Sequence, residues 1–511
     1  MNVLARRRYT LWRYAVALGT ASLIFTGCGG SQAQVGAPAT IQQSATRSGY
    51  PGRADSGMAH PPAVAKSQWT VSGRSILLDG EPFYIKGVDY GNTQIDDYSD
   101  PNPLDNANEP IWGPDLDAMC AAGVNAVKVY NVSLDSFKPY LPDLGNGNKL
   151  KPYETGKIDK FLDKAWNGCP GHPIYVVLSI FFGGYDVLNV PQKLKALKAV
   201  YQLTAREYAA YPAVMGFSLG SEINDGELIK IPEWWKNLNE IASSIRTGYK
   251  VTRSKKIITT TMVDTVADGK LTTLVAGEAN NFAIDAWGID SYRGYTFTDI
   301  WKQIKAATKK PQIMAEYGAS AGWWTQSSAT YDQTSHICPE NTYPAGSFRP
   351  PDWPKDKPWS GAPYWGLPGN QGGKPPWEHV RDLPASGNPN IHFLAAQVTS
   401  NAEELYANST SQGGVGSGGF YFEWNDEWAK AGWPHLQIGG GSNGKGAQNI
   451  APTPPFAGCY WDEAWFGLNS DKPVDRQYVF PGAGNPFPKR PADKHEPRAT
   501  LNAIKAAWAK E

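Results

Sequence analysis

The chain has 511 residues, 41% of them hydrophobic, which is enough for one large barrel with insertions or for two ordinary domains. Lys plus Arg and Asp plus Glu number 48 each, so no net charge draws the protein to nucleic acid or to an anionic membrane surface. The 20 Trp and 25 Tyr are many for so few charges, and flat aromatic rings suit the apolar faces of sugars, although core packing also explains part of them. We therefore expect an uncharged partner.

The amino terminus is typical of an export signal. Several arginines precede the apolar stretch "YAVALGTASLIFTGC" (14–28), which is too short to span a bilayer but fits the apolar region of a signal peptide. Its end resembles a bacterial lipobox with Cys28 as the acylated residue, and simple cleavage nearby is the alternative. We expect residues 1–28 to direct export, leaving the protein lipid-anchored in the cell envelope or secreted.

Residues 29–66 are rich in Gly, Ser, Gln, Ala and Pro and lack a periodic apolar pattern, which predicts a flexible tether before a folded domain at 67–511. The folded part contains an even number of cysteines, which in an oxidising compartment favours disulfides. We expect Cys120 to pair with Cys169 on the outer wall and Cys338 to pair with Cys459 over the loops. No metal-ligand spacing such as CxxC or HExxH occurs, so no metal or cofactor is expected.

Strand-like runs alternate with helix-like runs along the folded part, which predicts a parallel (β/α)8 barrel, an α/β fold with its active site at the carboxyl ends of the strands. The expected strands are 83–90, 126–132, 173–182, 214–222, 256–263, 285–292, 311–320 and 418–426. The expected helices include 114–123, 191–211, 232–250 and 297–310. A C-terminal extension follows the last strand.

Two of these predicted strands end on a glutamate. Glu316 lies in "PQIMAEYGAS" and Glu222 ends "VMGFSLGSE", so both carboxylates face one cleft in a parallel barrel. Glycoside hydrolysis needs two carboxyl groups on opposite sides of a sugar, one to protonate the leaving oxygen and one to attack the anomeric carbon or activate water. Either glutamate alone is typical of a surface or ion-paired residue; the pair at strands four and seven indicates this chemistry.

The motifs "GFSLGSEIND" and "PQIMAEYGAS", with "PFYIKGVDY" and "CAAGVNAVKVYNV", resemble clan A of the glycoside hydrolases, most closely the family 72 β-1,3-glucanosyltransferases and the family 2 barrels. The resemblance implies a retaining mechanism with Glu222 as general acid/base and Glu316 as nucleophile. It also implies that Tyr292 hydrogen-bonds the nucleophile and that Trp424 forms the aromatic floor of a sugar subsite. Further substrate-binding candidates are Ser221, Tyr90, Tyr130 and Trp323.

Two positions depart from the clan pattern. Ser221 stands where the clan has Asn, and its shorter side chain would reach a sugar 2-hydroxyl only through water. Lys128 stands where the clan has Arg and lacks the planar fork that supports a carboxylate at two points, so it is either a replacement for that arginine or a plain structural residue.

The connection between strands seven and eight, about residues 319–417, is unusually long and Trp-rich, and long ordered loops at this face are usually functional. Its tryptophans either pin an irregular loop or, as we favour for at least one of them, stack on sugars. The segment 459–467 borders the cleft or packs beneath it. The acids Glu423, Asp426 and Glu427 either bind hydroxyls or a cation or are simply solvated.

The sequence thus predicts a retaining glycosidase or transglycosylase acting on a β-linked glucan, with β-1,3-glucan favoured. Its partners would be a polysaccharide or oligosaccharide, with no nucleic acid, and a membrane only through Cys28. The alternative is a catalytically silent barrel that binds cell-envelope polysaccharide. Retention of both Glu222 and Glu316 favours the enzyme.

Overall fold

The computed structural model describes residues 67–92, 94, 102–132, 157–180, 188, 190–224, 227–250, 252–264, 266–267, 270–293, 296–297, 299–318, 390–427, 466–472 and 493–511. Several expectations from the sequence lie outside these residues. They are the export signal with Cys28, the tether 29–66, and the greater part of the segment 319–417, which includes Trp323. The predicted disulfide between Cys338 and Cys459 and the residues 459–465 also lie outside.

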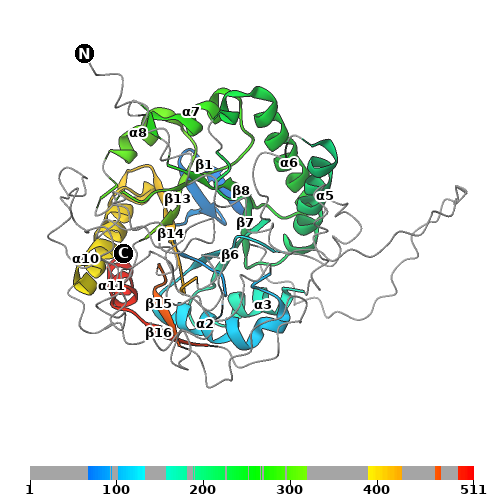
Figure 1. Ribbon diagram of the computed structural model, residues 1–511. Coiled ribbons are helices and arrows are strands. Elements are labelled where there is room, and N and C mark those ends of the chain that lie inside the picture. The colour runs from blue at the N-terminus through cyan, green and yellow to red at the C-terminus, as the bar shows by residue number, and fades with distance from the viewer. Residues whose placement is uncertain are drawn as a thin grey trace, which may run out of the picture.

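Parallel strands form the barrel that the sequence predicts, with helices outside it (Figure 1). In chain order the strands are β4 (Ile85–Asp89), β5 (Ala126–Lys128), β6 (Tyr175–Ile180), β7 (Val214–Leu219), β8 (Ile257–Thr260), β9 (Met262–Val263), β12 (Trp287–Asp290), β13 (Gln312–Tyr317) and β14 (Gly416–Tyr421). Their spatial order is β8-β7-β6-β5-β4-β14-β13-β12-β9. Because only Thr261 separates β8 from β9, the pairing of β12 with β9 closes the ring.

Every residue of β6, β7, β13 and β14 is buried. This is typical of parallel strands, which have helices on one side and the barrel interior on the other, and it explains why they read as continuous apolar runs. β14 uses glycines where neighbouring backbone is close: Gly418 has φ 90°, and a Cβ there would collide with the backbone of Ile85. Strand β14 can therefore lie against β4 only because it lacks side chains there.

The outer helices are α2 (Glu109–Ala122), α3 (Asp159–Asn167), α5 (Pro191–Tyr208), α6 (Pro232–Lys250), α7 (Thr272–Ala279), α8 (Ile300–Ala307), α10 (Asn390–Ala407) and α11 (Ala499–Trp508). Short 3-10 turns lie at Asn106–Asn108, Leu228–Lys230 and Thr410–Gln412. Helix α2 ends at Gly123, which adopts the left-handed conformation at φ 84°. Among the helices in the described ranges, none is both long and apolar enough to cross a bilayer.

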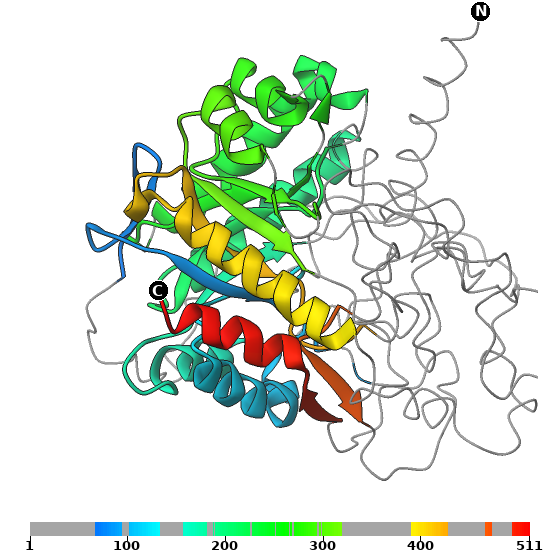
Figure 2. The ribbon, with the colours of Figure 1, turned by 90° about the vertical axis from the view of Figure 1, so that its left-hand side faces the viewer.

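Helix α10 occupies the end of the long connection between β13 and β14. Its residues Val398, Ala402 and Leu405 are buried in the core, and it lies beside α11 (Figure 2). The last part of the predicted 319–417 insertion is therefore the helix that precedes strand eight of the barrel.

A small sheet covers the amino-terminal end of the barrel. It consists of β1 (Trp69–Ser72), β2 (Ser75–Leu78) and β3 (Glu81–Pro82), and Trp69 is buried edge-on against Phe83 and Tyr175. The same apolar cluster includes residues from the starts of several barrel strands, such as Ile85 and Ala126. A further hairpin, of strands β10 (Val266–Ala267) and β11 (Lys270–Leu271), directly precedes α7. The apolar cluster closes the amino-terminal end, which leaves the carboxyl-terminal end for a site.

The C-terminal extension is joined to the barrel by buried ionic contacts. Strands β15 (Asn469–Lys472) and β16 (Lys494–Pro497) form a hairpin before α11. Arg498 makes a two-point contact with Asp426, at 2.5 and 2.6 Å. His495 lies between Asp115 of α2, at 2.7 Å, and Asp471 of β15, at 3.2 Å. These contacts make the extension part of the same folded unit as the barrel.

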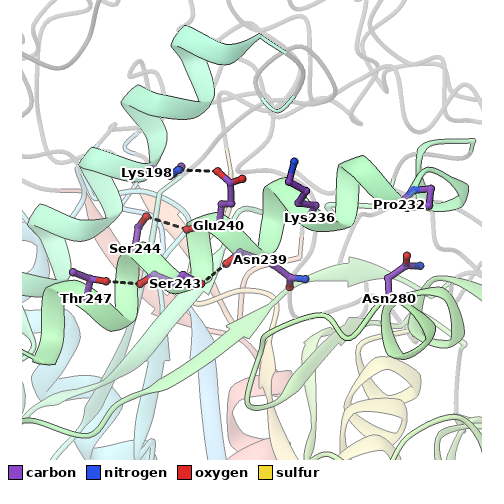
Figure 3. A pocket seen from close by; sticks show the side chains of 9 residues that line it. All are labelled: Lys198, Pro232, Lys236, Asn239, Glu240, Ser243, Ser244, Thr247 and Asn280. Atoms are coloured by element: carbon purple, nitrogen blue, oxygen red, sulfur yellow. Dashed lines mark hydrogen bonds and ion pairs between the residues drawn. The ribbon is translucent and has the colours of Figure 1, made fainter.

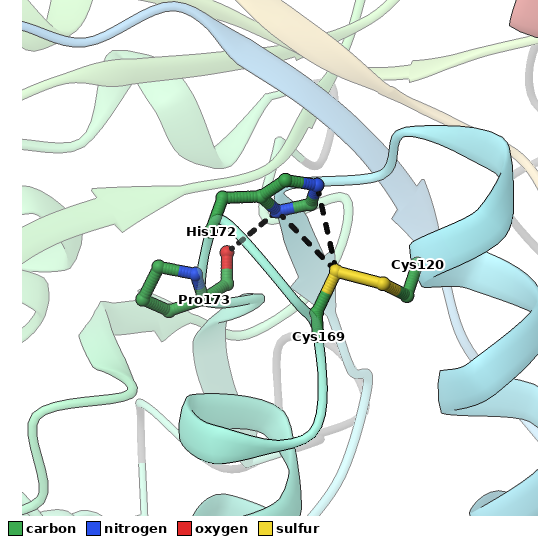
Figure 4. The surroundings of a disulfide bond; sticks show 4 residues. All are labelled: Cys120, Cys169, His172 and Pro173. Carbon is green, nitrogen blue, oxygen red and sulfur yellow. Dashed lines mark hydrogen bonds between the residues drawn. A yellow bond between two sulfur atoms is a disulfide. The ribbon is translucent and has the colours of Figure 1, made fainter.

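The predicted disulfide between Cys120 and Cys169 is confirmed, with a Cα–Cα distance of 5.5 Å (Figure 4). It joins α2 to the loop between α3 and β6 on the outer wall. The ring of His172 lies against Cys169 Sγ, with Nε2 at 3.5 Å. Because both sulfur atoms are used in the disulfide, this group of residues is not a set of free metal ligands.

Candidate active site

Glu316, next to last in β13, lies at the carboxyl-terminal end of the barrel and is only 7% exposed. Three side chains hold its carboxylate. Tyr130 donates a hydrogen bond to Oε1 at 2.5 Å, and Tyr292 donates one to Oε2 at 3.0 Å. Lys128 Nζ lies 3.7 Å from Oε1. Burial and the surrounding acids raise the pKa of both tyrosines well above the usual value, so both remain protonated donors.

The alternation of side chains along a strand explains this arrangement. Successive residues of a strand point to opposite faces, so residues two apart share a face. Lys128 and Tyr130 reach the barrel interior from β5 and the loop after it, and Tyr292 does so from the loop after β12. The sequence motifs "KVY" and "DSY" therefore each present two functional side chains to the same side.

Lys128 is the cation at the centre of the described site. It is 2% exposed, its Nζ lies 3.1 Å from Asp89 Oδ1, and it also lies over the ring of Tyr130 at 4.2 Å from the centroid. Burial lowers the pKa of Lys128, but Asp89 and Glu316 outweigh that effect, so the pKa is raised and the ammonium stays charged. Of the two readings of Lys128 that the sequence left open, the structure supports the one in which it contacts the strand-seven carboxylate.

Glu222 follows β7 on a strained turn. Its φ is 46°, in the left-handed region that residues other than Gly seldom occupy, and such strain is common at functional sites. Its backbone N–H donates to Thr261 Oγ1 at 2.9 Å, and the next N–H, of Ile223, donates to Thr261 O at 3.0 Å. Thr261 lies between β8 and β9, so the residue that interrupts this strand is the one that holds the turn of Glu222 in place.

Tyr201 of α5 also supports this turn, through hydrogen bonds to the end of β7. The hydroxyl of Tyr201 accepts the N–H of Gly220 at 2.9 Å and donates to the carbonyl of Ser218 at 2.8 Å. Tyr201 is fully buried. It therefore fixes the end of β7 just before the chain turns toward Glu222.

Glu222 and Glu316 approach each other closely. Carboxyl oxygens of Glu222, Asp290 and Glu316 all lie within 4.8 Å of one another. Glu222 is exposed, whereas Asp290 and Glu316 are buried. Three carboxylates at this spacing could hold a cation, but the Lys128 ammonium already provides positive charge beside Glu316.

Two buried aspartates at this site were missing from the sequence-based candidates. Asp89 ends β4 and Asp290 ends β12, with exposed fractions of 0% and 2%. Burial raises the pKa of each carboxyl group well above its usual value, and the charge of Glu316 raises both further. The signal that would have found them is their position, because each is the last residue of a barrel strand, as the carboxyl-end rule requires.

The structure does not bring Tyr90, a predicted substrate-binding residue, to the carboxylates of Glu222 and Glu316. Its hydroxyl donates to Asp115 of α2 at 2.7 Å, and its ring stacks near Phe161 on the outside of the barrel. Because Asp89 faces inward, the next residue faces outward.

Trp424 is 0% exposed and belongs to the apolar core, and its backbone N–H donates to Asp89 O. The expectation that its face would floor a sugar subsite does not fit this burial. Phe422 packs against the ring of Tyr130, and its cluster neighbour Phe466 packs against Tyr292, but Phe422 is itself only 4% exposed.

The remaining candidates have distinct environments. Ser221 is half-buried and its Oγ accepts a hydrogen bond from Thr261 Oγ1 at 3.5 Å, while Trp323 lies outside the described residues. Neither Glu423 nor Asp426 is solvated: Glu423 is 2% exposed, and Asp426 is paired with Arg498. Asp426 is therefore structural, and Glu427 is half-buried.

A separate cavity of about 500 Å³ lies on the outer wall over α5 and α6 (Figure 3). The described residues that line it include the ion pair between Lys198 and Glu240, and none of them is aromatic. It shares no residue with the carboxylate cluster at the barrel mouth.

No family model matches the chain, and no curated protein matches it. Solved structures that resemble it include a GH2 β-galacturonidase from Eisenbergiella tayi, with 10% identity and TM-score 0.44 over 87% of this chain and 54% of that one. A β-D-glucuronidase from Dictyoglomus thermophilum shows 12% identity and TM-score 0.44 over 87% and 54%. A β-glucuronidase from Bacteroides uniformis shows 13% identity and TM-score 0.39 over 70% and 33%. The chain thus spans about half the length of the first of these proteins, and a likeness this weak has no bearing on activity.

Proposed function

We propose that the protein is an exported retaining glycoside hydrolase or transglycosylase that acts on a β-linked glucan, with β-1,3-glucan the favoured substrate. The observation that carries the proposal is the environment of Glu316: a buried carboxylate held by Lys128, Tyr130 and Tyr292, with a Glu222 oxygen within 4.8 Å. Retaining enzymes place their two carboxyl groups about 5–5.5 Å apart, whereas inverting enzymes need about 6.5–9.5 Å to admit a water. The short separation favours retention.

In the first step Glu316 attacks the anomeric carbon as the bond to the leaving oxygen breaks, and Glu222 gives its proton to that oxygen. The product is a glycosyl ester on Glu316 and an ionised Glu222. Tyr130 and Tyr292 fix the direction of the attacking oxygen, because each donates to a different oxygen of the carboxylate.

In the second step Glu222 takes a proton from water or from a sugar hydroxyl, and the resulting nucleophile displaces Glu316 from the anomeric carbon. Two inversions restore the β configuration. Glu222 suits this exchange because it is exposed at the mouth, whereas Glu316 is buried beneath it.

The charge of the described site supports a neutral sugar as substrate. Lys128 is engaged with Asp89 and Glu316, and Arg293, which follows Tyr292, makes a two-point contact with Asp264. Among the described residues, one buried ammonium thus pairs with Asp89 and Glu316, and two more carboxyl groups, those of Glu222 and Asp290, lie close to Glu316. A carboxylate on the substrate would meet repulsion there.

The second candidate function is a silent barrel that binds polysaccharide without cleaving it. The two are separated by measuring reducing-sugar release from β-1,3-, β-1,4- and β-1,6-glucans and from an aryl β-glucuronide, with wild type, Glu316→Gln and Glu240→Gln. Glu240 is a carboxylate of the outer cavity and serves as the matched control.

We expect release from a neutral β-glucan by wild type and by the Glu240 variant, and none by the Glu316 variant. If all three proteins bind a glucan and none of them releases reducing sugar, the silent barrel is the function. Release from the glucuronide alone would contradict the neutral-sugar assignment.

Export is tested by fractionation. With a lipid anchor at Cys28, wild type should sediment with membranes and Cys28→Ser should not; a wild type that stays in the cytoplasm would remove export from the proposal.

A further inference from the structure

Asp290 is a buried acid in the described site that the two-carboxylate mechanism does not use. It is 2% exposed and ends β12, on the strand next to Glu316, with which it is in register. Neither of its carboxyl oxygens has a hydrogen-bond partner within the described part of the chain. Buried polar groups are nearly always hydrogen-bonded, so an unsatisfied one at a site indicates a ligand that would satisfy it.

The position of Asp290 limits what that ligand group can be. One of its oxygens lies within 4.8 Å of oxygens of both Glu222 and Glu316. These two glutamates act on the anomeric carbon and the oxygen bonded to it, so Asp290 faces the atoms next to that carbon. The polar atoms there are the ring oxygen, which gains positive charge in the transition state, and the hydroxyl on C2.

The charges around Asp290 determine its protonation. Among the described residues, the charged groups that act on it are Glu316, Lys128, Glu222 and Asp89, and of these four Lys128 is the positive one. Lys128 Nζ is within ion-pair distance of Asp89 and Glu316. A further negative charge on Asp290, buried beside the anionic nucleophile, would have no counterion within that distance among the described residues. A neutral acid is a hydrogen-bond donor, and a ring oxygen gaining positive charge is a poor acceptor, which leaves the C2 hydroxyl.

We propose that Asp290 is a substrate-contacting residue that donates, as a neutral carboxylic acid, a hydrogen bond to the C2 hydroxyl of the sugar held between Glu222 and Glu316. This inference rests on the proposed glycosidase function. It deepens that function by requiring a sugar with a free C2 hydroxyl. It also gives that hydroxyl a direct partner, which the short side chain of Ser221, bonded to Thr261, does not provide.

The test compares an aryl β-glucoside with its 2-deoxy analogue, using wild type, Asp290→Ala and Asp290→Asn. We expect Asp290→Ala to lower kcat/KM about 10- to 100-fold on the glucoside, because hydrogen bonds to this hydroxyl strengthen in the transition state, and to have little effect on the analogue. Asp290→Asn, whose amide also donates, should retain most of the activity. Equal losses on both substrates, or a loss in the Asn variant as large as in the Ala variant, would overturn the inference.

The matched control is Asp471→Asn, which removes a buried carboxyl group from the C-terminal hairpin. It should leave the ratio of the two kcat/KM values unchanged, whatever it does to stability. A shift in that ratio as large as that of Asp290→Ala would show that any buried acid produces the effect, and would overturn the inference.

An infrared difference spectrum, wild type minus Asp290→Asn at pH 7, tests the neutral state without any turnover. A protonated-carboxyl band present only in wild type supports the inference, and its absence overturns it. If wild type cleaves no glycoside at all, the proposed function fails, and this spectrum still decides whether Asp290 carries the proton.

Discussion

Replacing Lys128 with methionine removes the buried cation that contacts Asp89 and Glu316 while keeping most of the side-chain volume. At an effective dielectric constant of about 20, unit charges at the observed 3.1 and 3.7 Å attract each other by about 5 and about 4–5 kcal/mol. Desolvation of the ammonium offsets much of this, so the net value of the contacts is far smaller. Removing one member of a buried ion pair typically costs about 3–5 kcal/mol, because the remaining charges stay buried without a partner.

We expect Lys128→Met to lose about 3–5 kcal/mol of unfolding free energy at pH 7, measured by urea denaturation. The loss should be smaller at acidic pH. The pKa of Asp89 is raised in the folded state, so this carboxyl group favours folding when protonated and loses that contribution as the pH rises. Once Asp89 is protonated it needs no cation.

The matched control is Lys198→Met, which breaks a pair of similar chemistry to Glu240 at 2.7 Å on the outer wall, where both side chains are about a third exposed. Exposed pairs contribute about 0–1 kcal/mol. A Lys128 variant that is no less stable than this control, or whose loss does not shrink in acid, would refute the view that Lys128 balances the buried acids.

Three further changes test other parts of the structure. The acids around His495 outweigh the effect of its burial and raise its pKa to about 10. The stability that its pair with Asp115 provides should therefore be complete below about pH 6.5 and lost as the pH rises toward 10. In urea titrations, the unfolding free energies of wild type and His495→Gln should converge over this pH range. Arg498→Met should lower the unfolding free energy by about 3–5 kcal/mol by leaving Asp426 unpaired, and a drop in the single thermal transition of the whole chain would show it; a separate early transition would contradict a joined extension. Tyr201→Phe should cost about 1–3 kcal/mol by leaving the Gly220 N–H unsatisfied and should lower kcat more than it raises KM, whereas an unchanged kcat would show that the turn needs no such support.

The barrel was predictable because its signal is local. Runs such as "YVVLSI" and "VMGFSL" are buried at every position, and their alternation with amphipathic helices predicts a parallel barrel. Boundaries were less accurate: α2 begins at Glu109, five residues before the predicted start, because Pro110 fits in its first turn and Pro114 is accommodated inside it. Helix α10 was missed within a connection that the sequence presents as Trp-, Pro- and Gly-rich.

The two glutamates of the site were predictable because each ends an apolar run, where a carboxylate is costly without a purpose. Asp89 and Asp290 end strands in the same way, but a single aspartate followed by Tyr or Ser is equally typical of a solvated turn. Orientation was the other weakness. Which face Tyr90 or Trp424 presents depends on register and on how the chain leaves the strand, and neither is visible in residue type.

Contacts across long sequence separations were also beyond the sequence. The environment of His495 joins α2, β15 and β16, and nothing near these positions in the chain indicates that they meet. The same holds for the Tyr130 bond to Glu316, whose partners are 186 residues apart. Such pairs become visible only when the topology is known.

The most direct test of the unequal roles of Glu222 and Glu316 is the configuration of the glycosyl azide formed by each alanine variant. An activated aryl β-glucoside is incubated with azide, and the anomeric configuration is read by nuclear magnetic resonance. Glu222→Ala should give the β-azide, because azide displaces Glu316 from the glycosyl ester. Glu316→Ala should give the α-azide, because azide takes the place of the missing nucleophile on the opposite face. Azides of the same configuration from both variants, or full activity in either variant without azide, would contradict the assignment of Glu316 as nucleophile and Glu222 as acid/base.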